Sequence, residues 1–256
     1  MANIKVTTFN IRVVAEIDKP DNDFEKRKFR IFEFVEAEKP DVIGFQEVND
    51  HMRDCLREGL SGYTLVGCGR EKSYHGESAT IGYRTDKFEL IELKNFWLSP
   101  TPSIPGSRYS DQSNCPRVTT AALLKANGAD TPFWFINTHL DHEGKEARLF
   151  GALQLLHFIA EAKYPCVLTG DMNADPDSRP MQILVESPEC RLVDCTANIK
   201  GSFHAYRDIS EEEMGKIDYI FTNLPTDLAK TVLHEDKPVN GTFMSDHRPI
   251  SAYVEA

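Results

Sequence analysis

The sequence lacks the long apolar runs of a membrane protein. No stretch approaches a length of about 20 apolar residues, which a transmembrane helix requires. An alternating strand pattern starts at Ile4, which leaves no room for a signal peptide before it. We therefore expect a soluble, cytoplasmic protein that has no membrane partner.

Cysteine motifs are also missing. The six cysteines form no CxxC pair, and no group of histidines and cysteines has the sequence spacing of a zinc site. In a chain of this length, scattered cysteines indicate free thiols in a reducing compartment and not a disulfide framework.

Positive charge is scarce. The 29 Lys and Arg residues face 40 Asp and Glu residues, which gives a net charge of −11. A protein that holds a long nucleic-acid duplex needs a basic face, so this balance argues against such a partner. It permits a phosphorylated small molecule or a short nucleic acid as substrate, because a divalent cation can neutralise acids at a site. Simple solubility explains the charge equally well. The sequence gives no sign of an obligate protein partner.

The hydrophobic pattern predicts one α/β domain over residues 1–256, since no linker or low-complexity segment divides the chain. Helices are expected over residues 23–38, 51–58 and 146–162, the last with a buried stripe of Leu149, Leu153, Leu156 and Ala160. Residues 84–87 and 127–128 are expected to be hairpin turns, and residues 100–116 a long surface loop. Strands are expected near residues 4–9, 41–45, 63–68, 79–83, 88–98, 118–125, 132–138, 167–169, 217–222, 231–234 and 249–254.

The two halves of the chain resemble each other. A strand ending at Asn10, a helix and a strand ending near Glu47 are matched by a strand ending at His139, a helix and a strand ending at Asp171. We expect two similar sheet-and-helix halves to pack face to face, with their polar strand ends at one edge.

Short polar clusters close these apolar stretches, and their chemistry points to an enzyme. They are Thr8-Phe9-Asn10, Gly44-Phe45-Gln46-Glu47, Asn137-Thr138-His139, Gly170-Asp171-Met172-Asn173, Lys216-Ile217-Asp218-Tyr219 and Ser245-Asp246-His247. Strand ends on a rigid scaffold can direct side chains at a common point. Acids, amides and imidazoles gathered there suit metal-assisted phosphoryl chemistry.

Three of these residues are candidate metal ligands. Glu47 and Asp246 offer hard carboxylate oxygens, and Asn10 can offer a side-chain carbonyl oxygen. Mg²⁺ or Mn²⁺ prefers such oxygens and takes few protein carboxylates, whereas zinc prefers His or Cys. Taken singly, each acid is more often a helix cap or a surface charge, so the prediction depends on the joint pattern.

Other residues suit water activation and phosphate binding. Asp171 and Asn173 share a tight turn, which can equally be an Asx-turn that satisfies local backbone groups. Asp218 interrupts an apolar strand and needs a partner, for which His247 is a candidate. A neighbouring carboxylate raises the pKa of an imidazole, so His247 would be cationic. His139 can donate to the same phosphate or be an ordinary buried histidine.

The ordered set of clusters resembles the endonuclease/exonuclease/phosphatase superfamily, which has the DNase I-like fold. The resemblance spans nearly the whole chain. The segment from Phe96 to Pro102, with Cys115-Pro116-Arg117 after it, is similar to a bacterial subgroup and to the deadenylase and nocturnin branch. It implies a four-layer α/β sandwich in which two packed mixed β-sheets are flanked by helices.

The resemblance also implies roles for the clustered residues. Glu47 would hold the Mg²⁺ or Mn²⁺, with Asn10 and Asp246 nearby. Asp171 would orient or deprotonate a water, and Asp218 would support His247. The resemblance further implies that Asn173 and His139 would hold the phosphate. The prearranged cation and donors would stabilise the charge on the phosphoryl oxygens.

Some positions depart from the pattern of the deadenylase branch. Asp141-His142-Glu143 stands where those members tend to carry a basic residue, and Ser202-Phe203-His204-Ala205-Tyr206 only partly matches their Thr-Phe-His-Gly-Phe. Both differences weaken the case for a poly(A) or dinucleotide-phosphate substrate. Arg117 either reaches a substrate phosphate or pairs with an acid at a strand end.

The sequence therefore predicts a Mg²⁺-dependent hydrolase that cleaves a phosphodiester by water attack, as a nuclease or a small-molecule phosphodiesterase. One alternative uses the same site on a phosphomonoester, such as a sugar or inositol phosphate. A second alternative is a non-catalytic binding protein on the same fold.

Overall fold

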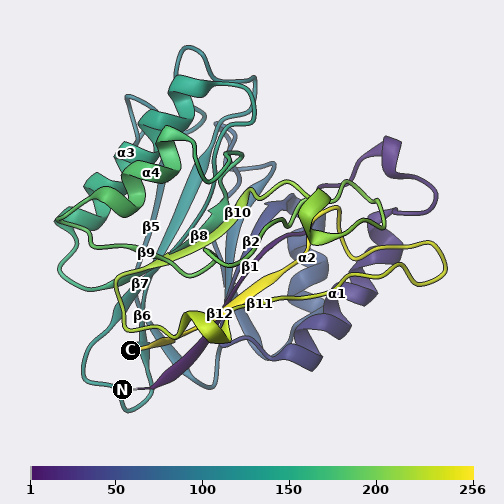
Figure 1. The fold of residues 1–256 in the computed structure, drawn as a ribbon, viewed down its shortest axis with the longest axis horizontal. Helices are drawn as coiled ribbons and strands as arrows, with labels where there is room; N and C mark the ends of the chain where they lie inside the picture. The colour runs from purple at the N-terminus through teal and green to yellow at the C-terminus, as the bar shows by residue number, and fades with distance from the viewer. Residues whose placement is uncertain (1) are drawn as a thin grey trace.

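Two mixed sheets of six strands form the centre of the structure, a computed structural model that describes residues 2–256 (Figure 1). Each sheet contains one parallel pair among antiparallel neighbours. In spatial order, the first sheet holds β11 (Val232–Leu233), β12 (Ile250–Glu255), β1 (Asn3–Asn10), β2 (Val42–Val48), β4 (Ser78–Arg84) and β3 (Tyr63–Val66). The second holds β5 (Phe88–Trp97), β6 (Val118–Ala126), β7 (Phe133–His139), β8 (Cys166–Asp171), β10 (Asp218–Thr222) and β9 (Val193–Asp194).

Helices cover the two outer faces, which gives four layers (Figure 1). Helices α1 (Phe24–Glu38) and α2 (Asp50–Gly59) pack on the first sheet, and α3 (Lys145–Glu161) and α4 (Arg179–Glu186) pack on the second. The short 3₁₀ helices are η1 (Glu16–Asp18), η2 (Glu211–Glu213) and η3 (Leu228–Lys230). The predicted four-layer DNase I-like sandwich is confirmed. Within residues 2–256, no helix has the length and apolar character needed to cross a bilayer.

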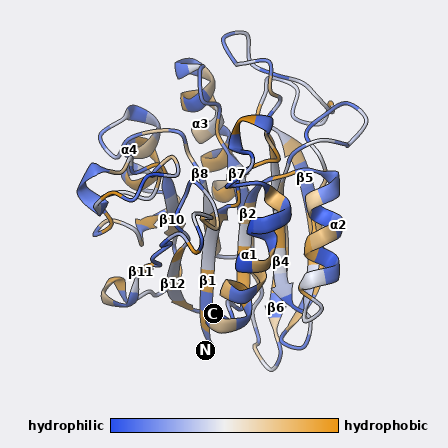
Figure 2. Cartoon of the chain, turned by 90° about the vertical axis from the view of Figure 1, so that its right-hand side faces the viewer, coloured by the Kyte–Doolittle hydropathy of each residue, from blue (hydrophilic) through white to orange (hydrophobic). Residues whose placement is uncertain are grey.

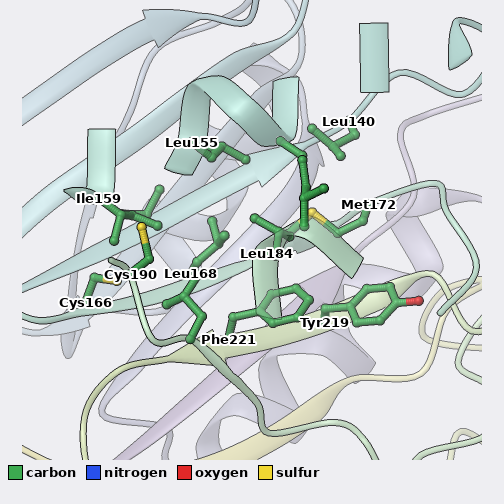
Figure 3. Packing of buried hydrophobic residues seen from close by; sticks show 14 of the residues in the cluster. Leu140, Leu155, Ile159, Cys166, Leu168, Met172, Leu184, Cys190, Tyr219 and Phe221 are labelled. Atoms are coloured by element: carbon green, nitrogen blue, oxygen red, sulfur yellow. The ribbon is translucent and has the colours of Figure 1, made fainter. Parts of the chain in front are cut away.

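Three apolar clusters hold the layers together. One lies between the sheets and includes Val6 of β1 and Phe135 of β7. The others lie under the helices, and Figure 3 shows Leu155 of α3 and Leu184 of α4 packed near Phe221 of β10. Each such fully buried side chain contributes about 1.5–3 kcal/mol relative to an exposed one. Figure 2 shows hydrophilic residues concentrated in the connecting loops and on the exposed sides of the helices.

Helix α1 follows its sequence pattern closely. Asp23 caps it by accepting a hydrogen bond from the Glu25 N–H, and the left-handed Lys39 before Pro40 ends it. Its apolar residues Phe24, Ile31, Phe34 and Val35 are buried.

Helix α3 has the predicted position, but its predicted buried face is wrong. Leu153 is 46% exposed, and the buried residues are Ala147, Gly151, Ala152, Leu155 and Ile159. Apolar residues occupy both sides of this helix, so their spacing did not distinguish one face. Small residues face the sheet because they allow the helix to approach it closely.

The predicted hairpin at residues 84–87 is also wrong. Strands β4 and β5 belong to different sheets, so this segment carries the chain from one sheet to the other. The other predicted hairpin is confirmed, because β6 pairs with β7 in antiparallel register. Residues 100–116 form a loop without strand or helix, as expected, whereas α4 and β9 were not predicted.

The two halves have the same local plan. Strand β1, helix α1 and strand β2 correspond to β7, α3 and β8, and both strand pairs are parallel. The predicted internal similarity and the face-to-face packing of the halves are confirmed.

A buried polar network also crosses between the sheets. The Asn137 amide donates to the carbonyls of Phe45 (2.8 Å) and Thr80 (3.0 Å), and its oxygen accepts from Gln46 Nε2 (2.7 Å). Gly44 makes this approach possible, because a Cβ there would lie 2.6 Å from Asn137 Oδ1. Asn137 therefore joins the sheets directly beneath the polar edge.

Gly44→Ala should destabilise the protein by about 1–3 kcal/mol, the usual cost of overpacking a buried interface. Gly62→Ala is the matched control, because a Cβ at Gly62 meets nothing within 4 Å. Urea unfolding measures both variants. Equal stability of the two variants would contradict the tight approach of the sheets at Gly44.

Candidate active site at the edge of the two sheets

The polar clusters meet at one edge of the sheets, as predicted from the sequence. Strand β1, which is parallel to β2, and strand β8, which is parallel to β7, both end at this edge. Strand β10, antiparallel to β8, begins there, with Asp218 directly opposite Asp171. Side chains alternate along a strand, so Asn10 shares the inward parity of Ile4 and Val6, which face the opposite sheet. The same parity brings Asp171 and Asp218 inward beside it.

Glu47 reaches the edge through an irregularity in β2. Regular alternation would place it on the helix side with Ile43 and Phe45, which pack under α1 and α2. Instead, the pairing with β4 shifts between Phe45 and Val48, and Glu47 has a φ of 64°. Bulges redirect side chains in this way, and left-handed backbone at a non-glycine residue is concentrated at functional sites. The bulge therefore turns the Glu47 carboxylate toward Asn10.

Asn10 joins the two halves through its amide nitrogen. Its Nδ2 donates to Glu47 Oε1 (3.0 Å) and to Asp171 Oδ2 (2.9 Å), and its Oδ1 accepts from the Arg12 N–H (2.9 Å). In this arrangement Asn10 orients two acids, and the expectation that its oxygen also ligates a metal stays a prediction. Burial alone would raise the pKa of Glu47, but hydrogen bonds from the Val13 N–H and Asn10 lower it.

His247 is held by Asp218, as expected. Its Nδ1 lies 2.8 Å from Asp218 Oδ2, which also accepts from Ser202 Oγ (2.5 Å). Burial alone would lower the pKa of His247, but the charge and hydrogen bond of Asp218 raise it to about 10. The imidazolium directs Nε2 between Asp171 Oδ2 (3.8 Å) and Asp246 Oδ1 (4.0 Å).

Asp171 is a buried acid with an elevated pKa. Burial and the neighbouring charge of Asp218 raise the pKa of Asp171 to about 7, against the opposing effect of His247. Its Oδ1 accepts the Asn173 N–H at 2.9 Å, which fixes the carboxyl plane. A carboxyl that titrates near neutral pH is suited to exchange a proton with a water.

His139 and Asn173 form a second pair beside Asp171. His139 Nε2 accepts from Asn173 Nδ2 (2.9 Å), and Asn173 also donates to the Leu140 carbonyl (3.0 Å). Both amide hydrogens of Asn173 have partners here, so Asn173 positions His139, and its expected contact with a phosphate stays a prediction. Burial and the charge of Arg117 hold the pKa of His139 well below its usual range, which keeps the ring neutral.

The acids at this edge fit a hard divalent cation. Donor atoms of Glu47, His139 and Asp171 lie within 4.8 Å of one another. Each Glu47 oxygen accepts one hydrogen bond, so acceptor capacity remains. Burial raises the pKa of Asp246, and the charge of Glu47 adds to that shift. A divalent cation relieves such crowding of buried acids, and carboxylate oxygens suit Mg²⁺ or Mn²⁺.

These residues line a cleft of about 400 Å³, and Arg117 lies on its wall. Of the two expectations for Arg117, the structure shows the pairing: its Nε lies 3.5 Å from Asp141 Oδ2, and its NH2 group is 2.8 Å from His142 Nδ1. Asp141 also accepts the N–H groups of Ser113 and Gly144. Asp141, which departs from the deadenylase pattern, therefore anchors the 100–116 loop and fixes Arg117 at the cleft.

Two further arginines of the cleft were not predicted. Arg12 follows β1 and pairs with Asp18 at 2.9 Å, and Arg70 pairs with Glu77 at 2.6 Å. Both come from loops without regular periodicity, so only their positions in the structure identify them.

Arg27 of α1 was also missed, although it stabilises the loops that carry the site. Its fully buried guanidinium donates to the carbonyls of Ile11 (2.6 Å), Arg12 (2.9 Å), Met244 (3.0 Å) and Asn22 (2.8 Å). Ile11 directly follows β1, and Met244 lies two residues before Asp246. Arg27 thus fixes one loop to the other. The sequence feature that could have identified Arg27 is its charge, because it lies between the apolar residues Phe24 and Ile31 of α1.

The two packed sheets, and the acids and histidines at their shared edge, have the DNase I-like architecture. A sequence model of the Endonuclease/Exonuclease/phosphatase family matches residues 7–247, and the chain belongs to that family. Members of this family generally use divalent metals, which agrees with the acid and histidine cluster at the edge.

Solved structures support this assignment. The endonuclease/exonuclease/phosphatase from Bacteroides vulgatus is 31% identical, with a TM-score of 0.92 over 100% of this chain and 99% of that chain. The mannosyl-6-phosphatase of Bacteroides thetaiotaomicron is 26% identical, with a TM-score of 0.86 over 98% and 100%. The human Nocturnin catalytic domain, 20% identical with a TM-score of 0.73 over 99% and 93%, shares the fold.

A curated relative is more distant. An uncharacterized protein of Acanthamoeba polyphaga mimivirus is 25% identical over 166 residues, which is 59% of this chain. The match spans 60% of the length of that viral protein.

Asp218→Asn should lower the pKa of His247 and so deprotonate it at pH 8. Burial lowers this pKa, and Asp218 contributes most to raising it to about 10, with smaller contributions from the charges of Asp246 and Asp171. Nitrogen-15 NMR of labelled histidines measures the charge state at pH 8. Asp227→Asn, an exposed acid, serves as control. An imidazolium signal for His247 that persists at pH 8 in Asp218→Asn would contradict the pairing.

Arg27→Lys should weaken Mg²⁺ binding by up to about tenfold, the lower end of the effect of losing a direct outer-shell partner, because Arg27 holds the backbone beside the ligands and not the ligands themselves. Lysine cannot reach four carbonyls from three segments, so the loops that carry the metal-binding acids should loosen. Calorimetric Mg²⁺ titration tests this, with circular dichroism to confirm folding. Lys26→Met, on the same helix, should bind Mg²⁺ normally. Undiminished affinity in a folded Arg27→Lys would argue against this clamp.

Proposed function

We propose that this chain is a divalent-metal-dependent phosphoesterase that hydrolyses a small phosphorylated substrate by direct attack of water. The observation that carries the proposal is the Asn10 bridge, which places Glu47 and Asp171 on the same amide at 3.0 and 2.9 Å. Glu47, which would hold the metal ion, and Asp171, which would accept the proton of the water, are thereby held next to each other. Attack of water on a metal-bound phosphoryl group requires this proximity.

The proposed roles follow from the atoms that face the cleft. Asp171, with a pKa of about 7, accepts the proton of the attacking water. His247 directs a charged Nε2–H between Asp171 and Asp246, where it meets a phosphoryl oxygen. Glu47 and Asp246 hold the cation, and a bound divalent ion supplies positive charge for the phosphoryl oxygens. Asn10, Asn173 and Asp218 keep these groups in place.

For the substrate, we place a phosphomonoester ahead of the phosphodiester favoured by the sequence. Arg12, Arg70 and Arg117 give the cleft three fixed cations. A monoester dianion gains more from such cations than a diester, which carries a single negative charge. The similarity to a mannosyl-6-phosphatase at 26% identity supports the same choice and suggests a sugar phosphate. The phosphodiester remains the second candidate, because the deadenylase-like sequence segments favour it.

Asp171→Asn should lower kcat by a factor of about 10² to 10⁴, the usual contribution of a general base. The substitution keeps the shape of the side chain and the Asn10 contact, so the variant should remain folded. Asp175→Asn, in the following turn, is the control and should retain activity. Steady-state kinetics with p-nitrophenyl phosphate measures both, and full activity in Asp171→Asn would rule out the assigned role.

Metal removal and a paired substrate assay test the proposed function. EDTA should abolish hydrolysis, and added Mg²⁺ or Mn²⁺ should restore it. p-Nitrophenyl phosphate and mannose 6-phosphate should then be cleaved faster than bis-p-nitrophenyl phosphate or short single-stranded DNA. Hydrolysis unaffected by EDTA would contradict the metal role, and faster diester cleavage would restore the second candidate. No turnover of any substrate would favour a binding protein.

A further inference from the structure

A second cluster of metal-binding side chains lies outside the cleft, where α1 begins next to α2. It consists of Glu25 in the first turn of α1 and of His51 and Cys55 in α2. Among the described residues that line the cleft, none belongs to this cluster. Because Glu25 comes from a different helix, the sequence spacing of histidine and cysteine did not reveal the group.

The three donor atoms already have the separations of a metal site. His51 Nε2 lies 2.7 Å from Glu25 Oε1 and 3.8 Å from Cys55 Sγ, and all three donors lie within 4.8 Å of one another. Ligand bonds of about 2.0–2.3 Å in a tetrahedral zinc site put neighbouring donors roughly 3.3–3.8 Å apart. The histidine and carboxylate need to separate only slightly to admit an ion.

Helical geometry supplies this arrangement. His51 and Cys55 are four residues apart, so they lie on the same face of α2, one turn from each other. Glu25 divides its two oxygens, with Oε2 on Lys28 Nζ (2.5 Å) and Oε1 on His51. One oxygen is therefore directed at the cluster while the other is held by the lysine.

We propose that Glu25, His51 and Cys55 form a binding site for a borderline-soft divalent metal of the Zn²⁺ class, separate from the oxygen-rich site of the cleft. A thiolate, an imidazole and a carboxylate favour such ions over Mg²⁺. The side chains of His51 and Glu25 are 60% and 53% exposed, so the ion can enter and a water can complete the tetrahedron. Binding releases the Cys55 thiol proton to solvent and links α1 to α2.

Co²⁺ is the probe, because its bond to a thiolate gives a charge-transfer band in the near ultraviolet. Titration of the full chain in excess Mg²⁺, which occupies the oxygen-rich cleft, should produce this band. Cys55→Ser should abolish it. His51→Ala should weaken Co²⁺ binding at least about tenfold. Loss of an outer-shell partner already has an effect of this size, and loss of a ligand should cost no less affinity.

The chain offers two matched controls. Cys115 is also half-buried but lines the catalytic cleft, so Cys115→Ser should keep the band. His157 faces Glu161 one turn away on α3 without a cysteine, so His157→Ala should bind Co²⁺ normally. Absence of the band in the wild-type protein would overturn the proposal. A charge-transfer band that persists in Cys55→Ser, or one that is lost in Cys115→Ser, would also overturn the proposal.

Zn²⁺ gives a second readout through stability. An ion that bridges two helices stabilises the folded chain, so saturating Zn²⁺ should raise the Tm of the wild-type protein more than that of Cys55→Ser. Glu25 and His51 are exposed and Cys55 is half-buried, and serine differs from cysteine by one atom, so Cys55→Ser should fold without metal. Equal shifts of Tm in the two proteins would contradict a bridging ion.

Discussion

The amide of Asn10 is the contact on which the site depends. It belongs to the first sheet, yet it donates to Glu47 of its own sheet and to Asp171 of the other. The half-buried carboxylate of Glu47 and the buried carboxylate of Asp171 repel each other, and a shared donor offsets part of that repulsion. The distance between the metal side and the water side of the site is therefore set by one side chain and by the packing of the two sheets behind it.

The surrounding contacts keep this arrangement rigid. Asn137 links the sheets below the site through hydrogen bonds to β2 and β4. From the outer layer, Arg27 fixes the loops on either side of the metal-side acids. Arg30, one turn further along α1, pairs with Asp236 at 3.1 Å, and Asp236 accepts the Met244 N–H. Helix α1 thus supports the site although none of its residues lines the cleft.

Much of the fold and the positions of the polar clusters were predictable from the sequence. Alternation along β1 placed Asn10 on the inward face, and each cluster followed an apolar run that became a strand. Glu47 was found only by its place in the ordered motif. Strict alternation points it at the helices, and the bulge that redirects it has no clear signal in the local residue pattern.

The remaining differences come from contacts that join distant segments. Asn10 and Asn173 were expected to bind ligands because amides can do so, and the sequence did not show that each amide also holds a neighbouring side chain. The segment 84–87 looks like a hairpin turn because local sequence cannot tell whether two successive strands share a sheet. Arg70 and Arg12 depend on loop conformations that no periodicity encodes.

Direct metal binding tests the central claim, because the shared amide should control how the acids hold an ion. Electron paramagnetic resonance titration with Mn²⁺ can compare the wild-type protein with Glu47→Gln and Asn10→Ala. We expect tight binding in the wild-type protein, a large loss in Glu47→Gln and a smaller loss in Asn10→Ala. Equal Mn²⁺ affinity in all three folded proteins would contradict a metal centre organised by Asn10 and Glu47.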